Sequence, residues 1–434
     1  MRFRFLVFMS IFMFSWLVAQ ERVTIISIAG VINPVSSDFI HRAIEQSEND
    51  GSQCLVILLD TPGGLVTSMR QITRNIMNAS VPIVVYVYPS GAHAGSAGVF
   101  VTLAAHIAAM APGTNIGAAS VVSLGFGVGS DSSNATMMRK ATNDAVAFIK
   151  SIAEERGRNA EWAEKAVTEA AAVSAREALE LNVIDLIAPN LDSLLAAIDG
   201  KVVKTALGMD TLRTRDCEKQ YLEMSLQDKI LDVISNPTIA YILFILGLYG
   251  LFFELYNPGA IFPGVIGGIC IILFFYAMHT LPVNYAGIML ILLAVLLFIL
   301  EIKITSYGIL TIGGVVSFIL GSIMLYGSNS PFLKISWEVI AAVTAFTVLF
   351  FLVAIGLGLR AQLLKPAIGR EHIVDSEAEA LEDFVNGKGQ VKHEGEIWQA
   401  VSEDEIHKGD RLRVVNIKGL TMRVEKKREG GREN

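Results

Sequence analysis

Apolar runs and amphipathic runs alternate along the first half of the chain, and this alternation predicts its secondary structure. Apolar runs rich in valine and isoleucine, at residues 23–29, 54–60 and 81–88, indicate buried strands. Runs with helical spacing lie between them, at residues 36–47 and 67–78. Strands and helices in this order form a mainly parallel sheet covered by helices. We therefore expect an α/β domain whose site lies beyond the carboxyl ends of the strands.

Five long stretches in the second half almost lack polar positions, and they predict a helical membrane domain over residues 237–360. Each approaches the length of about 20 residues that a spanning helix needs. Glu254 and Glu301 lie at the ends of two stretches, where a charge reaches the interface, so we do not interpret them as a proton path. The five stretches cover residues 239–253, 262–278, 286–300, 307–325 and 339–359.

The start of the chain has the pattern of a secretory signal peptide over residues 1–19. A basic beginning is followed by an apolar core at residues 5–18 and by Ala19, a suitable cleavage residue. An uncleaved anchor is the alternative. In both cases the α/β domain, residues 22–230, is expected outside the cytoplasm, in the periplasm. Five spans then return the chain to the cytoplasm, which predicts a multi-pass protein of the cell (inner) membrane.

The last predicted domain covers residues 370–428. Its short strand-like runs are separated by Gly395, Gly409 and Gly419, at a spacing of roughly ten residues that is typical of a small β-barrel. We predict an OB-like barrel on the cytoplasmic side of the membrane. Trp398 is expected in its core rather than as a platform for stacked bases.

Composition and charge narrow the function. The chain is 52% hydrophobic and 18% charged, with the apolar excess concentrated in the first 20 residues and in the membrane stretches. A formal net charge of −7 gives no general attraction to nucleic acid, so no nucleic-acid partner is expected. The three cysteines have neither metal-ligand spacing nor a disulfide framework. No metal or other cofactor is predicted.

Candidate chemistry centres on Ser96, which lies in a run of alanine and glycine at residues 91–98. This run follows a strand pattern and leads into a helical pattern at residues 99–105. A serine at such a turn has an accessible hydroxyl and faces backbone N–H groups at the helix start. These are parts of an acyl-transfer site with half of an oxyanion hole. A turn of small residues that merely packs against a neighbouring helix explains the local pattern equally well.

A serine needs a base to take its proton, and two residues are candidates. Lys140 lies on a helix expected over residues 134–155, among apolar residues of the kind that make a lysine a usable base. An ordinary surface pair with Asp144, four residues on, is the competing interpretation. His93 lies three residues before Ser96, although a residue on an adjacent turn rarely points back correctly. His106 is expected to pack.

Several motifs together resemble the long-form NfeD family, in order and over nearly the whole mature chain. They are Thr61–Gly64 (TPGG), Ser96–Gly98 (SAG), residues 110–119 (MAPGTNIGAA), residues 140–145 (KATNDA), Gly157–Asn159 (GRN) and Asn236–Pro237. The family comprises membrane-bound serine peptidases of the ClpP class, with a ClpP/crotonase-like fold. The resemblance implies that Ser96 is the nucleophile and Lys140 the general base of a Ser/Lys dyad. It also implies an oxyanion hole made by the N–H groups of Gly64 and Ala97.

The same resemblance suggests partners and a substrate class. Family members are associated with stomatin-like or flotillin-like (SPFH) membrane proteins, so an apolar segment of such a protein is the expected substrate. A glycine-rich stretch after Ser120 carries the apolar residues expected to bind it. A homo-oligomer, a dimer or larger, and contact with membrane lipid are also expected. The predicted substrate-binding residues are Val121, Val122, Leu124 and Phe126.

Two other functions fit parts of the pattern. A crotonase-like acyl-CoA enzyme also holds an oxyanion with paired N–H donors, although a signal peptide argues against an intracellular substrate such as CoA. A non-catalytic membrane scaffold would use the spans and the barrel to assemble a complex. Labelling of Ser96 by an active-site-directed serine probe, tested for dependence on Lys140, would separate the three.

Overall fold

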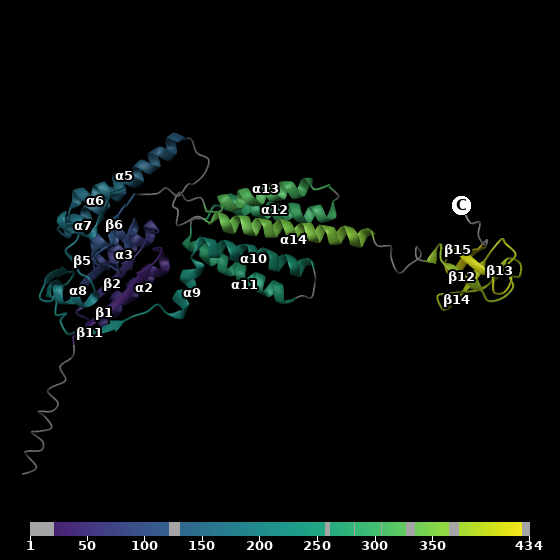
Figure 1. The fold of residues 1–434 in the computed structure, drawn as a ribbon, viewed down its shortest axis with the longest axis horizontal. Coiled ribbons are helices and arrows are strands. Elements are labelled where there is room, and N and C mark those ends of the chain that lie inside the picture. Colours follow the sequence, from purple (N-terminus) through teal and green to yellow (C-terminus); the bar gives the residue numbers. More distant parts are fainter. Residues whose placement is uncertain are drawn as a thin grey trace, which may run out of the picture. The chain divides into compact units, whose positions relative to one another are not determined.

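A computed structural model describes residues 21–120, 131–256, 261–281, 283–304, 306–326, 335–363 and 373–427 (Figure 1). The predicted signal peptide therefore lies outside the described residues. The chain divides into two compact units. One unit comprises residues 1–297 with 311–345, and the other comprises residues 298–310 with 346–434.

A six-stranded parallel sheet forms the centre of the N-terminal domain, as the alternating pattern predicts. Its middle strands carry almost continuous valine, isoleucine and leucine, because helices cover both faces. The edge strand β11 was not predicted, and it pairs with β1 from Arg22 to Ile25. In spatial order the strands are β11 (Glu218–Tyr221), β1 (Arg22–Ala29), β2 (Cys54–Asp60), β3 (Ile83–Val87), β5 (Ile107–Met110) and β8 (Leu186–Ile187).

Two hydrophobic clusters pack against the sheet. The larger one includes buried residues of α2, α3, α4, α5, α6 and α7. The smaller one includes buried residues of α8. The helices are α2 (Pro34–Asn49), α3 (Val66–Met77), α4 (Ala97–Ala104), α5 (Asp131–Glu155), α6 (Ala160–Thr168), α7 (Ala175–Glu180) and α8 (Leu191–Ile198).

Two small sheets complete this domain. One contains β4 (His93–Ala94), β6 (Asn115–Gly117) and β7 (Ala172–Ser174). The other is a hairpin of β9 (Val202–Thr205) and β10 (Gly208–Thr211). Residues 202–211 therefore form a hairpin that is separate from the main sheet.

Helix α9 (Leu226–Ile234) leads into five apolar helices at the predicted positions. Within the described residues, Pro237–Leu255 and Ile261–Met278 are long and apolar enough to cross a membrane, and three shorter apolar helices follow. Glycines bring pairs of these helices close together, since a Cβ on Gly250 would lie 2.6 Å from the Cα of Gly267. The helices are α10 (Pro237–Tyr256), α11 (Ile261–Thr280), α12 (Tyr285–Lys303), α13 (Ile309–Met324) and α14 (Trp337–Leu363).

Glu301 has a structural role at the start of a helix. Its carboxylate accepts a hydrogen bond from the Ser306 hydroxyl at 2.6 Å and another from the Gly308 N–H at 3.0 Å, just before α13 begins. A negative group at this end also complements the helix dipole. Glu254 packs beside α11, where a Cβ on Gly264 would lie 1.8 Å from its Oε2 atom.

The C-terminal unit ends in a closed five-stranded barrel, which confirms the predicted fold of this part. Its strands follow the spatial order β12 (Glu377–Ala380), β13 (Lys388–His393), β14 (Glu396–Val401), β16 (Thr421–Lys426) and β15 (Arg411–Lys418). Val391, Leu412, Val414 and Met422 form the centre of its core. Trp398 packs against this core, partly buried, as predicted.

Candidate functional site

Ser96 caps the N-terminus of α4 in an unusual backbone conformation. Its φ is 47° and its ψ is −108°, a combination that a residue with a side chain rarely adopts. Its N–H donates a hydrogen bond to the Ala118 carbonyl at 2.6 Å, which holds the turn in place. The predicted helix start after a strand is therefore present, with the short strand β4 between β3 and Ser96.

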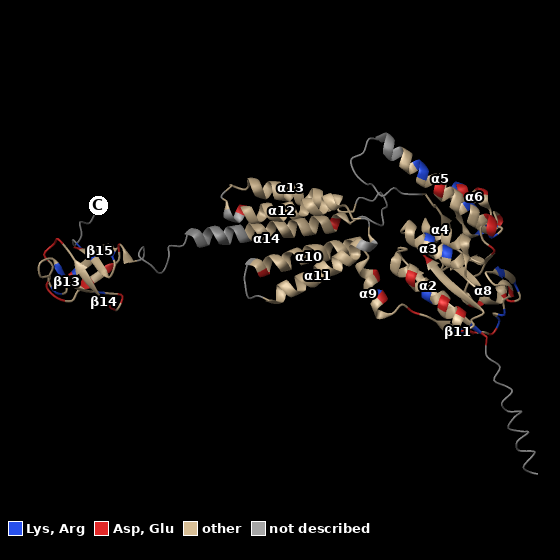
Figure 2. Ribbon diagram, turned by 180° about the vertical axis from the view of Figure 1, so that it is seen from behind, with Lys and Arg blue, Asp and Glu red and all other residues tan. Residues whose placement is uncertain are grey.

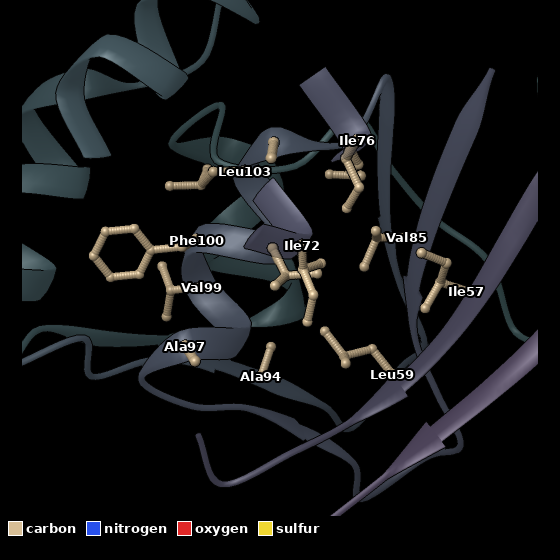
Figure 3. Close-up of a cluster of buried hydrophobic side chains, with 14 of the residues drawn as sticks. Ile57, Leu59, Ile72, Ile76, Val85, Ala94, Ala97, Val99, Phe100 and Leu103 are labelled. Atoms are coloured by element: carbon tan, nitrogen blue, oxygen red, sulfur yellow. The ribbon is translucent and has the colours of Figure 1, made fainter. Parts of the chain in front are cut away.

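Small residues allow this turn to approach its neighbours closely. A Cβ on Gly95 would lie 2.9 Å from the Pro62 carbonyl oxygen, and one on Gly98 would lie 2.7 Å from Cγ2 of Thr61. Phe100 and Leu103 of α4 then pack into the core beside Ile72 of α3 (Figure 3). The small side chains of residues 91–98 thus allow α4 to pack closely against the loop that follows β2.

The loop at residues 61–64 forms the other wall of the site. Gly63 has a φ of 126°, and a Cβ on it would lie 2.6 Å from the Cβ of Ser96. A Cβ on Gly64 would lie 2.0 Å from the Ile32 carbonyl oxygen. Thr61 fixes the loop, since its hydroxyl accepts from the Gly63 N–H at 3.0 Å and its carbonyl accepts from the Gly95 N–H at 2.8 Å. A side chain at either position would clash with a neighbouring residue, so both positions require glycine.

Two backbone donors in these elements have no partner. Among the described residues, the N–H groups of Gly64 and Ala97 donate to no acceptor. Ala97 is the first residue of α4, where the helix dipole favours negative charge. The loop that holds Gly64 lies against Ser96 through the neighbouring Gly63. An oxyanion formed at Ser96 could be stabilised by donors of this kind.

Lys140 lies on the exposed, N-terminal part of α5, which extends away from the sheet (Figure 1). It makes no hydrogen bond or ion pair with any residue that the structure describes, so the structure does not join it to Ser96. Helix α5 does contact α4, since the rings of Phe148 and Phe100 stack with centroids 6.0 Å apart. Lys140 lies eight residues before Phe148, about 12 Å along the helix.

Asp144 pairs with Arg70 instead of with Lys140, the partner considered from the sequence. Its carboxylate binds Arg70 of α3, and the Arg70 guanidinium also lies 4.5 Å from the ring centre of Phe148. The surface pair between Lys140 and Asp144 is therefore not formed. Arg70 therefore links α5 to α3.

Neither His93 nor His106 is hydrogen-bonded to Ser96 in the described part of the chain. The imidazole of His93 packs against Gly95, and its Nδ1 is buried without a hydrogen-bond partner among the described residues. His106 packs, as expected, and its Nδ1 accepts a hydrogen bond from the Ile83 N–H at 3.0 Å. Burial lowers the pKa of His106 to about 3, with further lowering by the charges of Arg156 and Arg158.

Two arginines hold the other end of α4, and their role was not predicted. Arg158 donates to the carbonyls of Leu103 at 2.6 Å and Ala105 at 2.8 Å, and it forms a 2.6 Å ion pair with Asp185. Arg156 donates to the Ala104 carbonyl at 2.8 Å. Positive groups at this end satisfy the last carbonyls of the helix and complement its dipole. The motif at residues 157–159 was the available signal, although its spacing does not reveal the contact.

The predicted substrate-binding residues Val121, Val122, Leu124 and Phe126 lie outside the described residues. Their role stays a prediction. The structure describes the chain up to Ser120 and again from residue 131, where α5 begins.

The fold and the serine at its helix terminus define an α/β domain with a candidate acyl-transfer site, joined to apolar helices and a barrel. Residues 22–197 match the N-terminal domain of NfeD1b, residues 238–356 match the NfeD integral membrane domain, and residues 367–426 match the NfeD-like C-terminal, partner-binding domain. The chain is 35% identical to membrane-bound protease PH1510 of Pyrococcus horikoshii, over 98% of this chain and 97% of that protein. The chain belongs to the NfeD family.

The chain is also similar to a second membrane protein and to solved structures. Membrane protein NfeD1b of Bacillus subtilis is 27% identical over 76% of this chain and 73% of that protein. The solved 1510-N membrane protease, specific for a stomatin homologue from Pyrococcus horikoshii, is 35% identical and matches 50% of this chain and 99% of that one, with a TM-score of 0.43. A ClpP1 mutant from Listeria monocytogenes matches at 20% identity over 39% of this chain and 94% of its own, with a TM-score of 0.32. The predicted family is confirmed, and the relationship to PH1510 supports a membrane protease.

Proposed function

We propose that this protein is a membrane-bound serine endopeptidase with Ser96 as nucleophile and Lys140 as general base. The observation that carries the proposal is the position of Ser96 at the N-terminus of α4, with a φ of 47°. Its turn lies against the loop that holds Gly64, and the N–H groups of Gly64 and Ala97 have no partner among the described residues.

The proposed chemistry uses these groups in sequence. Lys140 takes the proton of the Ser96 hydroxyl as the oxygen attacks a peptide carbonyl, and the N–H groups of Gly64 and Ala97 stabilise the resulting oxyanion. The lysine then gives its proton to the leaving amine, and water hydrolyses the acyl-enzyme. The proposal requires Lys140 to approach Ser96 during turnover. Its exposed side chain has no competing partner in the described part of the chain.

The proposed substrate is an apolar segment of a stomatin-like membrane protein. The solved N-terminal domain of the Pyrococcus relative is described as specific for a stomatin homologue, which supports this class. The apolar residues Val121, Val122, Leu124 and Phe126 would contact the segment. The match of residues 367–426 to a partner-binding domain supports a stomatin-like or flotillin-like partner for the barrel. We also propose a homo-oligomer.

The proposed orientation places the two soluble domains on opposite sides of the membrane. A signal peptide over residues 1–19 would export the N-terminal domain, and five spans would return the barrel to the cytoplasm. Cleavage outside the cytoplasm would then be linked to a partner inside it.

An active-site-directed serine probe tests the proposed dyad. We expect the full-length wild type in detergent to be labelled at Ser96, and we expect Ser96→Ala and Lys140→Ala to lose labelling and peptide cleavage. Loss of the nucleophile or its base lowers the rate by orders of magnitude. Lys140→Arg should not restore activity, because a guanidinium is not a base near neutral pH. Lys150→Ala is the matched control, since Lys150 lies on the same helix and pairs with Glu164.

The remaining outcomes distinguish the alternatives. Ser96 labelling that persists in Lys140→Ala would move the role of base to another residue such as His93. An unlabelled wild type that binds an acyl-CoA would favour the crotonase-like enzyme. An unlabelled wild type that still binds a stomatin-like protein would favour the scaffold.

A further inference from the structure

Helix α9 (Leu226–Ile234) connects the N-terminal domain to the first membrane helix, and its polar face is turned toward the domain. The Asp228 carboxylate forms a 2.7 Å ion pair with Arg42 of α2. The Asp232 carboxylate accepts a hydrogen bond from the Asn33 side chain at 2.6 Å, at the start of α2. Asp228 and Asp232 are four residues apart, so they lie on the same face of α9.

The opposite face of α9 is apolar and exposed. Leu226 is 81% exposed, Ile230 is 59% exposed and Val233 is 56% exposed. At 100° per residue these three side chains share a narrow stripe, centred about 150° around the helix from the two aspartates. A helix on the surface of a soluble domain has the reverse arrangement, with its apolar stripe against the core. Another environment must therefore cover this stripe.

The position of α9 in the chain identifies that environment. Residues 238–356 match an integral membrane domain, and α10 begins at Pro237, just after α9 ends at Ile234. The two residues between them span at most about 7 Å, so the C-terminal end of α9 stays close to the start of α10. It also packs against both α10 and α11. Acyl chains and headgroups are thus within reach of the stripe without any second protein.

We infer that α9 is an interfacial helix whose Leu226, Ile230 and Val233 insert at the boundary between lipid headgroups and acyl chains. Its aspartate face holds the N-terminal domain against the bilayer through Arg42 and Asn33. Helices of this kind lie in the plane of the interface with their apolar face a few ångströms deep. The inference does not depend on the proposed chemistry at Ser96.

The charges on α9 define how it binds the membrane. Lys229 pairs with Glu223 at 3.0 Å, while Asp228 and Asp232 contact Arg42 and Asn33 of the domain. Acidic positions on α9 are red in Figure 2. The helix therefore has no excess of basic residues to attract anionic headgroups. Insertion depends on apolar contact, and it is insensitive to the fraction of anionic lipid.

The test uses the full-length protein in nanodiscs that hold one copy. In a Cys217→Ser background, an environment-sensitive fluorophore is attached at Ile230→Cys, while Cys54 and Cys270 stay buried. The matched control is Leu207→Cys, an 85% exposed leucine in the turn between β9 and β10. Lipids with a spin label near the headgroup quench a fluorophore only when it lies among them.

We expect a blue shift and strong quenching at position 230, no quenching at position 207, and the same result when anionic lipid is added. A label at position 230 that behaves like the one at position 207 would overturn the inference. Shielding of position 230 only in discs with two copies, without lipid quenching, would assign the stripe to contact between copies and would also overturn it. Quenching that appears only with anionic lipid would overturn the apolar mode of insertion.

Discussion

At the scale of single residues, the site depends on backbone positions where a Cβ does not fit. Ser96 adopts a positive φ, and Gly63 and Gly64 bring the facing loop into contact with it and with Ile32. A positive φ costs a residue with a side chain of order 1–3 kcal/mol, so surrounding contacts must hold Ser96 in place. The hydrogen bonds of Thr61 and Ala118 supply such contacts.

Gly63→Ala should abolish peptide cleavage, because its Cβ would lie 2.6 Å from that of Ser96 and displace the loop. Gly30→Ala is the matched control, since Gly30 also has a positive φ, of 104°, and a Cβ on it would meet no neighbouring atom within 4 Å. Both variants should lose about 1–3 kcal/mol of stability from backbone strain. Cleavage rates and thermal unfolding of the two variants separate the effects. Equal loss of activity in both would contradict a specific role for the Gly63 contact.

His106 gives the N-terminal domain a defined pH dependence. Its pKa is about 3 in the folded protein, because burial and the nearby Arg156 and Arg158 charges disfavour protonation, whereas its ordinary value is 6.5. The unfolded chain therefore binds a proton that the folded domain does not, and stability falls as pH decreases from 6.5 toward 3. The slope approaches about 1.4 kcal/mol per pH unit.

The measurement compares denaturant unfolding of wild type and His106→Gln between pH 7 and pH 4. A glutamine oxygen can still accept from the Ile83 N–H, while it takes up no proton. The variant should have a flatter pH dependence. Identical slopes would show that His106 does not contribute.

The residue pattern predicts the local setting of Ser96 better than it predicts the packing around Lys140. The place of Ser96 at the start of α4 follows from local order, because a strand, a run of small residues and a helix follow one another in the chain. The place of Lys140 depends on how α5 packs, and that packing uses Arg70, Asp144 and Phe148 from separate elements. The clamp of Arg156 and Arg158 on α4 likewise joins parts of the chain about 50 residues apart, which spacing alone does not reveal.

At the scale of elements, strong periodicity gave accurate predictions and weak patterns did not. The apolar strands β1, β2 and β3 and the five apolar helices lie where their runs predict them. Strand β11 has the polar sequence EKQY and belongs to the sheet only through its pairing with β1. Such a strand is defined by its partner, so its own composition does not identify it.

At the scale of the whole molecule, the order of the three parts makes orientation a testable property. We expect a reporter fused after Lys204 to be active outside the cytoplasm and one fused after Glu425 to be active inside it. The physical reason is that an odd number of spans separates the two points, and Arg360, Lys365 and Arg370 follow the last span. Reporters active on the same side would contradict either the five spans or the signal peptide.

Strand β11 also determines how the N-terminal domain could be released from the membrane. Residues 218–221 complete the sheet edge beside β1, and they precede α9 by only a few positions. A cut before residue 218 would leave this strand on the membrane side and uncover the apolar edge of β1, which invites aggregation. A cut after Tyr221 would release a domain with its edge intact. Release of the domain by proteolysis and production of a soluble fragment therefore require the same cut, after Tyr221. This cut lies beyond α8, the last helix of the domain's core.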